Sequence, residues 1–423
     1  MYKFPYPDLP ELEIPAENLI GIFESGLMEP EASVGQIISE AMGNPIGMER
    51  LANYLNDRSR VLILSDDNTR ATPVRDIIPL VLEEIHSAGV KTENVKILMA
   101  LGTHRPMSPE ELLLKLGSEV CRRYEVINHR WDDQRNLIDY GRTDSGIRIK
   151  ANKLIEWSDF TIAIGGIIPH AVAGFSGGGK MIVPGICGEE TSGDMHWHMS
   201  QLAPEELFGV RDNPVRKVID EVAVGAGLKF IVNCITNNEG QVVRAVAGDP
   251  VRAHRVGTEH AKTVHGINIP EKADIVIFDS YLTDIEYWQA IKAITPAGIV
   301  AKEGAILIQV AECREGVSKS HGEVLRYGYH SFTETKKLLE TGCVNKSVAA
   351  HMIQASFAIK EAGRKGYLIS PYISKTDTER LGFLYAPTPA EALENALSER
   401  GKDARIIVLR QAGDLLPVFE GRT

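Results

Sequence analysis

The sequence predicts an α/β protein of two domains, with largely parallel sheets covered by helices and an active site in the interdomain cleft. Short apolar runs rich in β-branched residues alternate with amphipathic helical patterns, as in parallel sheets buried on both faces. This alternation pauses near residues 268–272 and then restarts. The chain has 423 residues, which exceeds one ordinary hydrophobic core.

The part of the chain before residue 268 is predicted to form four strands and four helices. The strands are expected at residues 61–64, 95–100, 160–164 and 230–235, and the helices at 77–88, 109–116, 213–226 and 250–264. Gly89 ends the first of these helices, and Ser108 is a favourable cap for the second. Each strand is followed by a helical pattern, which favours β-α-β units.

The same rhythm restarts after the polar, proline-containing stretch at residues 268–272. Strands are expected at residues 274–278, 305–310 and 405–409, and helices at 285–293, 333–340, 349–362 and 389–398. We therefore predict domains at residues 1–268 and 273–423, separated by this linker.

Composition excludes several classes of function. The net charge of −11 argues against nucleic acid or an anionic membrane as the main partner. The five cysteines include no C-x-x-C pair, which argues against a zinc ribbon or a disulfide framework. The first residues lack the apolar core of a signal peptide, and no run approaches the ~20 apolar residues of a membrane span. We expect a reduced, cytoplasmic protein.

The stretch from Gly165 to His198 is the most informative part of the sequence. It combines a glycine-rich loop with one lysine and three histidines, which serve as proton carriers, metal ligands and covalent anchors. Its residues 174–180 fit G-x-x-x-x-G-K, the start of a phosphate-binding P-loop. Met181 stands where that motif needs Ser or Thr. A nucleotide-binding phosphotransferase is therefore the weaker alternative.

Polar clusters follow three of the predicted strands, at residues 65–70, 102–105 and in the glycine-rich loop after residue 164. Ligands of open α/β sheets bind beyond the carboxyl ends of strands, so these clusters are expected to meet. Arg70 can hold a carboxylate or phosphate there, or form only a surface ion pair. His104 and His170 can form an acid/base pair on the two faces of one carbon, or be structural.

Two further groups of residues stay open to more than one interpretation. Lys180 can contact phosphate, form a Schiff base or anchor a covalent cofactor. His196 and His198 are expected in a loop, on opposite sides of an extended segment, so only one is expected to bind a given metal ion. Other ligands of that ion would come from outside the protein. Gln289 and Lys292 share one face of a predicted helix, which either reaches the cleft or faces solvent.

The chain resembles the nickel-dependent lactate racemase family of 2-hydroxyacid racemases and epimerases. Motifs in the same order and spacing cover nearly the whole chain: Asn44-Pro45-Ile46-Gly47, Asp66-Asp67-Asn68-Thr69-Arg70, Gly102-Thr103-His104-Arg105, Pro169-His170, Ala173-Gly174-Phe175-Ser176-Gly177-Gly178, Lys180, His196, Gly248-Asp249-Pro250 and Gln289/Lys292.

The resemblance implies nickel held by a pyridinium-3-thioamide-5-thiocarboxylic acid mononucleotide, the nickel-pincer nucleotide. Lys180 corresponds to the lysine that tethers this cofactor, and His196 to the nickel-binding histidine. His104 and His170 correspond to the acid/base pair, while the C2 hydride passes to the cofactor and returns to the other face. The N-terminal domain would then bind the cofactor and carry the catalysis, and the C-terminal domain would contribute substrate contacts.

The resemblance extends to the binding residues and partners. Polar groups of the substrate or cofactor would be held by Arg70, Gln289 and Lys292, and Trp288 would be a further substrate contact. The cofactor side would include Asp67, Gly174, Ser176, Gly177 and Gly178. Trp288 stands where the lactate enzymes have tyrosine, so the sequence leaves open which small anionic 2-hydroxy acid is the substrate. Proteins that build the cofactor are expected partners. A non-catalytic ligand-binding protein is the remaining alternative.

Overall fold

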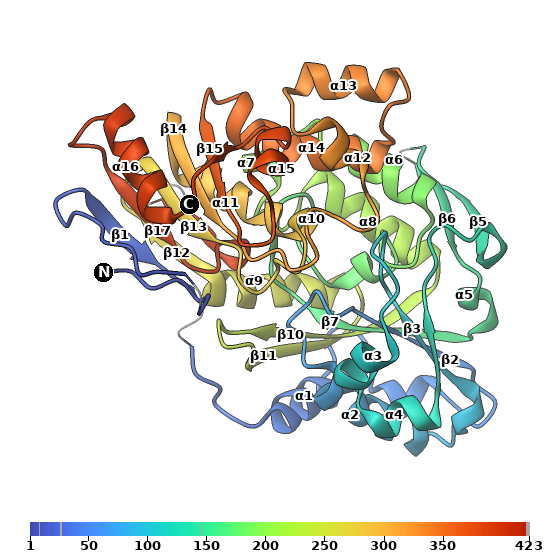
Figure 1. The fold of residues 1–423 in the computed structure, drawn as a ribbon. Coiled ribbons are helices and arrows are strands. Elements are labelled where there is room, and N and C mark those ends of the chain that lie inside the picture. Colours follow the sequence, from blue (N-terminus) through green and yellow to red (C-terminus); the bar gives the residue numbers. More distant parts are fainter. Residues whose placement is uncertain (8, 26–27, 145, 420–423) are drawn as a thin grey trace.

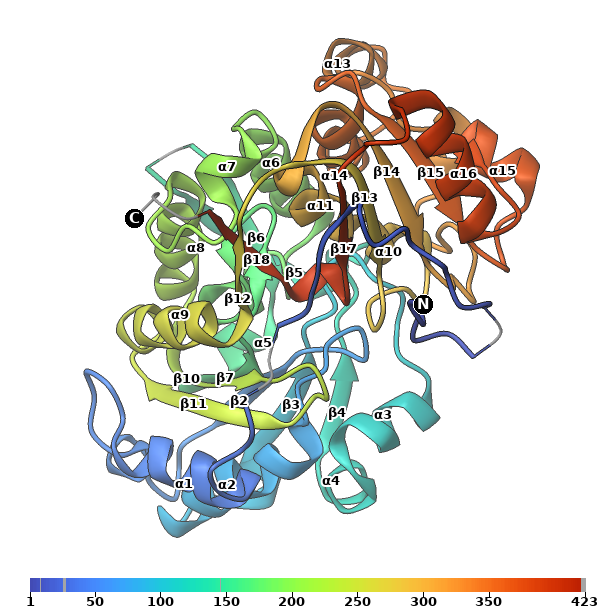
Figure 2. The ribbon, with the colours of Figure 1, turned by 90° about the vertical axis from the view of Figure 1, so that its left-hand side faces the viewer.

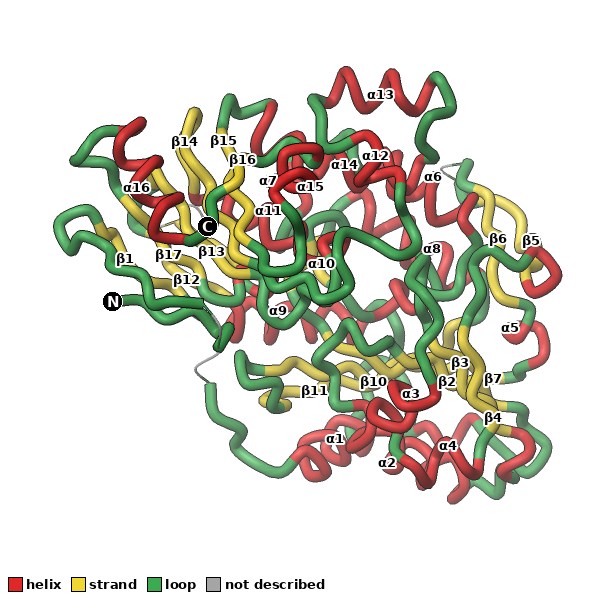
Figure 3. Tube along the Cα trace, viewed as in Figure 1, coloured by secondary structure: helices red, strands yellow, loops and turns green. Residues whose placement is uncertain are grey.

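The computed structural model describes residues 1–7, 9–25, 28–144 and 146–419. These residues form two six-stranded sheets with helices on their faces (Figure 1; Figure 3 distinguishes the helices from the strands). The predicted α/β class with largely parallel sheets is confirmed.

The first sheet has the strand order β11-β10-β7-β2-β3-β4 and is parallel except for β11. Its strands are β2 (Val61–Ser65), β3 (Val95–Met99), β4 (Glu125–Asn128), β7 (Phe160–Gly166), β10 (Leu228–Thr236) and β11 (Val242–Gly248). The chain builds outward through β3 and β4 on one side of β2 and through β7 and β10 on the other. The strand order therefore reverses between β2 and β7, where doubly wound folds bind ligands.

Helices cover both faces of the first sheet because its strands alternate apolar side chains between two cores. The covering helices are α1 (Val34–Gly43), α2 (Val74–Ser87), α3 (Pro109–Leu116), α4 (Ser118–Arg123), α8 (Pro214–Gly225) and α9 (Arg252–His265). Ser108 caps α3 by a capping box with Glu111, as the sequence predicts.

The second sheet is parallel throughout, in the order β1-β17-β13-β14-β15-β16. Its strands are β1 (Leu19–Phe23), β13 (Ala273–Asp279), β14 (Ala301–Val310), β15 (Lys365–Ile369), β16 (Leu384–Tyr385) and β17 (Ile406–Leu409). Helices α11 (Ile294–Val300) and α14 (Lys346–Ala355) contribute to the core on one face. Helix α16 (Pro389–Arg400) and the aromatic N-terminal segment cover the other.

The chain crosses between the two sheets more than once. The N-terminal strand β1 pairs with β17 of the second sheet, whereas most of the chain before residue 268 belongs to the first sheet. The aromatic residues before β1 also pack on the second sheet, which explains this position. Near the C-terminus, β18 (Leu416–Phe419) returns to pair with β12 (Gly266–Ile269), as Figure 2 shows. The border at residues 268–272 stays a prediction.

Most expected elements are present, and three differ. The helix expected at 285–293 is split into α10 (Tyr287–Ala290), a 3₁₀ turn (Ile291–Ala293) and α11. The helix begins only at Tyr287, because Glu286 is extended and the N–H of Tyr287 donates to Gly316 O, and Pro296 lacks the N–H that a continuous helix would need. The helix expected at 349–362 is α14 followed by a π turn (Ser356–Lys360). The segment with His196 and His198, expected as a loop, is helix α6 (Glu189–Met199).

Small elements complete the fold: β5 (Leu137–Arg142), β6 (Arg148–Asn152), α5 (Leu154–Trp157), β8 (Pro169–His170), β9 (Gly174–Phe175), α7 (Pro204–Leu207), α12 (Glu323–Tyr327), α13 (Phe332–Glu340) and α15 (Lys375–Arg380). Among the residues described, no helix has both the length and the apolar character needed to cross a membrane.

Candidate active site

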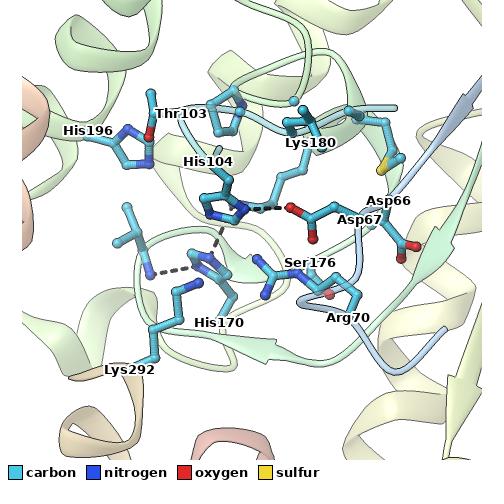
Figure 4. A pocket seen from close by; sticks show the side chains of 18 of the residues that line it. Asp66, Asp67, Arg70, Thr103, His104, His170, Ser176, Lys180, His196 and Lys292 are labelled. Atoms are coloured by element: carbon cyan, nitrogen blue, oxygen red, sulfur yellow. Dashed lines mark hydrogen bonds and ion pairs between the residues drawn. The ribbon is translucent and has the colours of Figure 1, made fainter. Parts of the chain in front are cut away.

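A pocket lies where the strand order of the first sheet reverses, at the carboxyl ends of β2 and β7. The loop after β2, the loop after β3 and the glycine-rich loop after β7 line it, and α10 and α14 close it from the second sheet. It encloses about 1010 Å³ when its open mouth is counted. Figure 4 shows its polar side chains gathered around a common space. The expected convergence of three strand-end clusters is therefore confirmed.

The loop after β2 is held by buried ion pairs and hydrogen bonds. Asp66 pairs with the buried Lys115 at 2.8 Å and accepts a hydrogen bond from Thr72 Oγ1 at 2.5 Å. Asp67 accepts hydrogen bonds from the backbone N–H and the hydroxyl of Thr69. These contacts present the Arg70 guanidinium to the pocket, whose wall it forms.

His104 is the centre of a hydrogen-bond chain that links the two halves of the molecule. Its Nδ1 lies 2.6 Å from Asp67 Oδ2, and its Nε2 lies 2.8 Å from Gln289 Nε2. Lys292 donates to Gln289 Oε1, which orients the Gln289 amide so that its N–H₂ faces His104. In neutral His104 the Nδ1 proton therefore goes to Asp67, and the Nε2 lone pair accepts the Gln289 amide N–H.

The Asp67 carboxylate stays ionised beside this histidine. Burial by itself raises the pKa of Asp67, but the neighbouring His104, Arg70 and Thr69 together lower that pKa below its usual value. Asp67 lines the pocket and holds His104 from one side.

Gln289 lies behind the pocket lining, 1% exposed, and its amide contacts His104 and Lys292, so in this structure it positions both residues. A contact between Gln289 and substrate stays a prediction.

His170 has the opposite hydrogen-bonding pattern. Its Nδ1 accepts the backbone N–H groups of Val172 and Ala173 at 3.1 and 3.3 Å. In neutral His170 the proton is therefore on Nε2, which lies 3.3 Å from Lys180 Nζ. Burial and then the nearby Lys180, Lys292 and Arg70 lower the pKa of His170 well below its usual value. The two histidines share one pocket, but one offers an acceptor and the other a donor.

Arg70, Lys180 and Lys292 line the pocket, whereas the carboxylates in its lining, Asp66 and Asp67, are already paired with Lys115 and His104. Burial, followed by the charges of Arg216 and Arg70, lowers the pKa of Lys180 well below its usual value. Burial and the charges of Arg70 and Lys180 do the same to the pKa of Lys292. A neutral Lys180 amine is a nucleophile, and an anionic ligand would relieve the repulsion among these groups.

The glycine-rich loop is shaped by buried side chains beneath it. Arg216 donates to the carbonyls of Phe175 and Gly177, Asn233 Oδ1 accepts the N–H of Gly178, and His254 Nε2 lies 2.8 Å from Ser176 O. Ser176 and Gly177 reach the pocket wall.

Gly174 and Gly178 lie outside the pocket lining, and a cofactor contact at either glycine stays a prediction. Both have positive φ, and a Cβ would lie 2.1 Å from Val210 O at Gly174 and 2.8 Å from His254 at Gly178. The loop therefore packs closely against the segment that precedes α8 and against α9, which favours glycine at both positions.

His196 reaches the pocket from α6. Glutamates in the first turn of α6 and histidines in its last turn favour this helix electrostatically, a signal that identifies it in the sequence. Gly193 allows α6 to pack against α14, since a Cβ would lie 3.2 Å from Lys346 Cβ. His196 lines the pocket whereas His198 is exposed, so the two histidines lie apart as expected, although on a helix.

His196 has the tautomer of a metal ligand. Its Nδ1 donates to Ser192 O at 2.7 Å, because a carbonyl can only accept, and this leaves the lone pair on Nε2. Burial and the neighbouring Lys180 lower the pKa of His196 to about 4. Among the described residues there is no group of three or more His, Cys, Asp or Glu that could hold a metal ion.

Trp288 is clamped between two histidines on the side of the second sheet. Its ring stacks on His321 at 3.9 Å and on His351 at 3.7 Å between ring centroids. The ends of β13 and β14 support α10, because Gln309 Nε2 donates to Ser280 Oγ and to Ala290 O. Trp288 therefore forms a rigid part of the pocket wall.

Sequence reasoning missed one wall of the pocket, the polar face of α14. Ser347, His351 and Gln354 line the pocket and recur at i, i+4 and i+7. These polar residues on one face of a helix that is otherwise apolar were the signal that identifies them.

Known proteins with a related sequence or fold agree with this architecture. Family models match residues 8–206 (lactate racemase N-terminal domain) and residues 269–414 (lactate racemase C-terminal domain). A lactate racemase of Thermoanaerobacterium thermosaccharolyticum is 33% identical over 309 residues, 72% of each chain. A lactate racemase of Lactiplantibacillus plantarum is 27% identical over 405 residues, 94% of each chain.

Two solved structures share the fold. The lactate racemase apoprotein from T. thermosaccharolyticum matches with a TM-score of 0.85 and 28% identity, covering 97% of both chains. A Thermotoga maritima protein matches in fold with a TM-score of 0.75 and 23% identity, over 93% of this chain and 100% of that one. The sequence matches and the shared fold together place this chain in the lactate racemase family, and it is an isomerase.

Proposed function

We propose that this enzyme inverts the C2 configuration of a small anionic 2-hydroxy acid, as a lactate racemase does, using nickel in a pyridinium mononucleotide tethered to Lys180. The observation that carries the proposal is the meeting of an acceptor histidine, a donor histidine and buried cations in one pocket. When bound, the nickel-pincer nucleotide supplies a reversible acceptor for the C2 hydride.

The residues present fit such a group. Burial and the charges of Arg216 and Arg70 lower the pKa of Lys180, which favours the nucleophilic amine that a covalent amide-type tether requires. His196 offers one nitrogen lone pair, and it belongs to no group of three or more described His, Cys, Asp or Glu that could hold a metal ion. A metal ion here would therefore need its remaining ligands from the bound group itself, in a geometry that Ni(II) accepts. Loading would depend on proteins that build the cofactor.

Different side chains of the protein bind the substrate carboxylate and handle the hydroxyl proton. Arg70 and Lys292 attract the substrate carboxylate and orient C2. Once the substrate hydroxyl replaces the Gln289 amide at His104 Nε2, this nitrogen takes the hydroxyl proton, while Asp67 stabilises the imidazolium that forms. His170 stays neutral, and its Nε2–H hydrogen-bonds the carbonyl oxygen of the planar 2-keto acid while it turns over. The His104 imidazolium then returns the proton to that oxygen, so both histidines end the reaction as they began it.

The tether is tested by Lys180→Ala, with Lys217→Ala on the exposed face of α8 as a matched control. Protein produced together with the cofactor-building proteins is analysed by intact mass spectrometry and for nickel content. We expect Lys180→Ala to lose the added mass and the control to keep it. A Lys180→Ala protein that retains the covalent mass would refute the tether.

Hydride return is tested with C2-deuterated acids and chiral chromatography of the products. Inversion with the deuterium retained supports hydride transfer, whereas deuterium lost to water would indicate simple proton abstraction and contradict the proposal.

The phosphotransferase alternative is weaker still, because the lysine of the glycine-rich loop lies in a short 3₁₀ turn (Gly178–Met181) rather than at a helix N-terminus. Family membership sets aside the non-catalytic alternative.

A further inference from the structure

Helix α14 presents three polar side chains to the pocket on a single face. Ser347 and His351 are 5% and 6% exposed, and Gln354 is half-buried. All three line the same pocket as His104 and His196. They lie beside Trp288, opposite the loops of the first sheet that carry Asp67 and Lys180.

Two of these side chains have hydrogen-bonding capacity that the protein does not use. Ser347 Oγ and Gln354 Oε1 are buried and have no partner among the described residues. Buried polar atoms in native proteins are normally paired, and an unpaired one is costly. Because both residues belong to the pocket wall, a bound molecule is the natural source of the missing partners.

The wall itself is rigid. His351 Nε2 lies 2.9 Å from the Tyr329 hydroxyl, and the His351 ring stacks on Trp288 with an interplanar angle of 10°. Hydrogen-bonding groups on a fixed surface select for a ligand with matching groups.

The charge of this face of α14 indicates which polar group of a ligand it can bind. A second carboxylate would need a cation on this wall, and α14 contributes none to the pocket lining. The nearest lysine of the helix, Lys346, is paired with Asp194 of α6. Burial, together with His321 and Lys292, lowers the pKa of His351 well below its usual value, so this ring is neutral. A neutral polar surface suits hydroxyl groups and disfavours both carboxylates and hydrocarbon.

We propose that the face of α14 formed by Ser347, His351 and Gln354 is a subsite for hydroxyl groups on the substrate chain beyond C2. The preferred substrate is then a polyhydroxylated 2-hydroxy acid rather than lactate, whose methyl group would leave these atoms unpaired. This inference rests on the proposed C2 inversion. Ribose hydroxyls of the cofactor offer the same chemistry, and the experiment separates the two sources.

The experiment measures kcat/KM for C2 inversion by cofactor-loaded enzyme with gluconate, lactate, malate and phenyllactate. We expect gluconate to exceed each of the others at least tenfold. Ser347→Ala and Gln354→Leu should each lower the gluconate-to-lactate ratio of kcat/KM about tenfold. Ser356→Ala is the matched control: Ser356 directly follows α14, is buried and donates to Glu361 outside the pocket, so the ratio should not change.

Each outcome separates the subsite from the proposed function. Conversion of lactate as fast as gluconate would overturn the subsite and leave the C2 inversion intact. Ser347→Ala could instead lower kcat/KM equally for all acids and carry less covalent cofactor by mass spectrometry. That result would show that this face of α14 binds the cofactor, and it would overturn the substrate subsite. No conversion of any acid by protein with confirmed cofactor would refute the proposed function and this inference with it.

Discussion

The two sheets share a reversal of strand order but use it differently. In the first sheet the reversal between β2 and β7 opens into the pocket with His104 and Lys180. In the second sheet the reversal lies between β13 and β17, and the chain's own N-terminus closes it. There, Tyr2 donates to Asp279 and Tyr6 donates to Asp284 at 2.6 Å.

The same topology forms a ligand pocket in the first sheet and a hydrogen-bonded structural edge in the second. At the first reversal, cations and histidines crowd together with few acidic partners, an arrangement suited to a ligand rather than to stability. At the second, buried carboxylates receive tyrosine hydroxyls and backbone N–H groups. Ser280 and Gln309 at this edge hydrogen-bond α10, which carries Trp288 to the pocket wall and Gln289 to His104. Variants at the first reversal should therefore affect activity, and variants at the second should affect stability.

The largest expected effect is on activity at the first reversal. His104→Ala should lower kcat by a factor of about 10²–10⁴, because it removes a positioned general base. The midpoint of thermal unfolding should change little, since His104 is half-buried at the edge of a pocket. His198→Ala on the exposed side of α6 serves as the control and should leave kcat unchanged. A loss of less than tenfold in His104→Ala would contradict the assigned role.

The second prediction concerns the pH dependence of stability at the other reversal. Burial, opposed in part by hydrogen bonds from Gln411, Tyr281 and Tyr2, raises the pKa of Asp279 to about 7. Between about pH 4 and 7 the unfolded chain releases this proton while the folded protein keeps it. Stability from this group therefore falls as pH rises, by at most about 1.4 kcal/mol per pH unit.

Asp279→Asn removes that titration while keeping an acceptor oxygen. The difference in unfolding free energy between variant and wild type, measured by urea denaturation, should shift in favour of the variant from pH 5 to pH 7. A difference that does not vary with pH would show that Asp279 titrates normally in the folded protein.

The smallest effect is expected from Tyr6→Phe. It removes the hydroxyl that donates to buried Asp284, which keeps the N–H of Glu312 as a partner. Unfolding free energy should fall by about 1 kcal/mol, while kcat of the loaded enzyme stays within twofold. Tyr385→Phe, at an exposed position, is the control for stability. If Tyr6→Phe abolished activity while stability held, the second reversal would also have to be regarded as functional.

Local sequence patterns determined much of this protein. Apolar runs such as Val61–Ser65 can be buried only as strands between helices, so the α/β class was predictable. Because ligand sites lie beyond the carboxyl ends of such strands, Asp67, Arg70, His104 and Lys180 were placed together correctly. Glutamates and histidines at the ends of α6 also carried a local signal, which the glycines around them obscured.

Other features depend on contacts between distant parts of the chain, and only the tertiary structure decided them. β1 joins the second sheet because aromatic residues before it pack there. The different tautomers of His104 and His170 follow from Asp67, 37 residues away, and from backbone N–H groups of a turn. Gln289 supports His104 across 185 residues, and α14 faces the pocket because Gly193 allows a close approach. Residue types thus identify the chemistry that is available, whereas orientation and protonation depend on neighbours that are brought together only by folding.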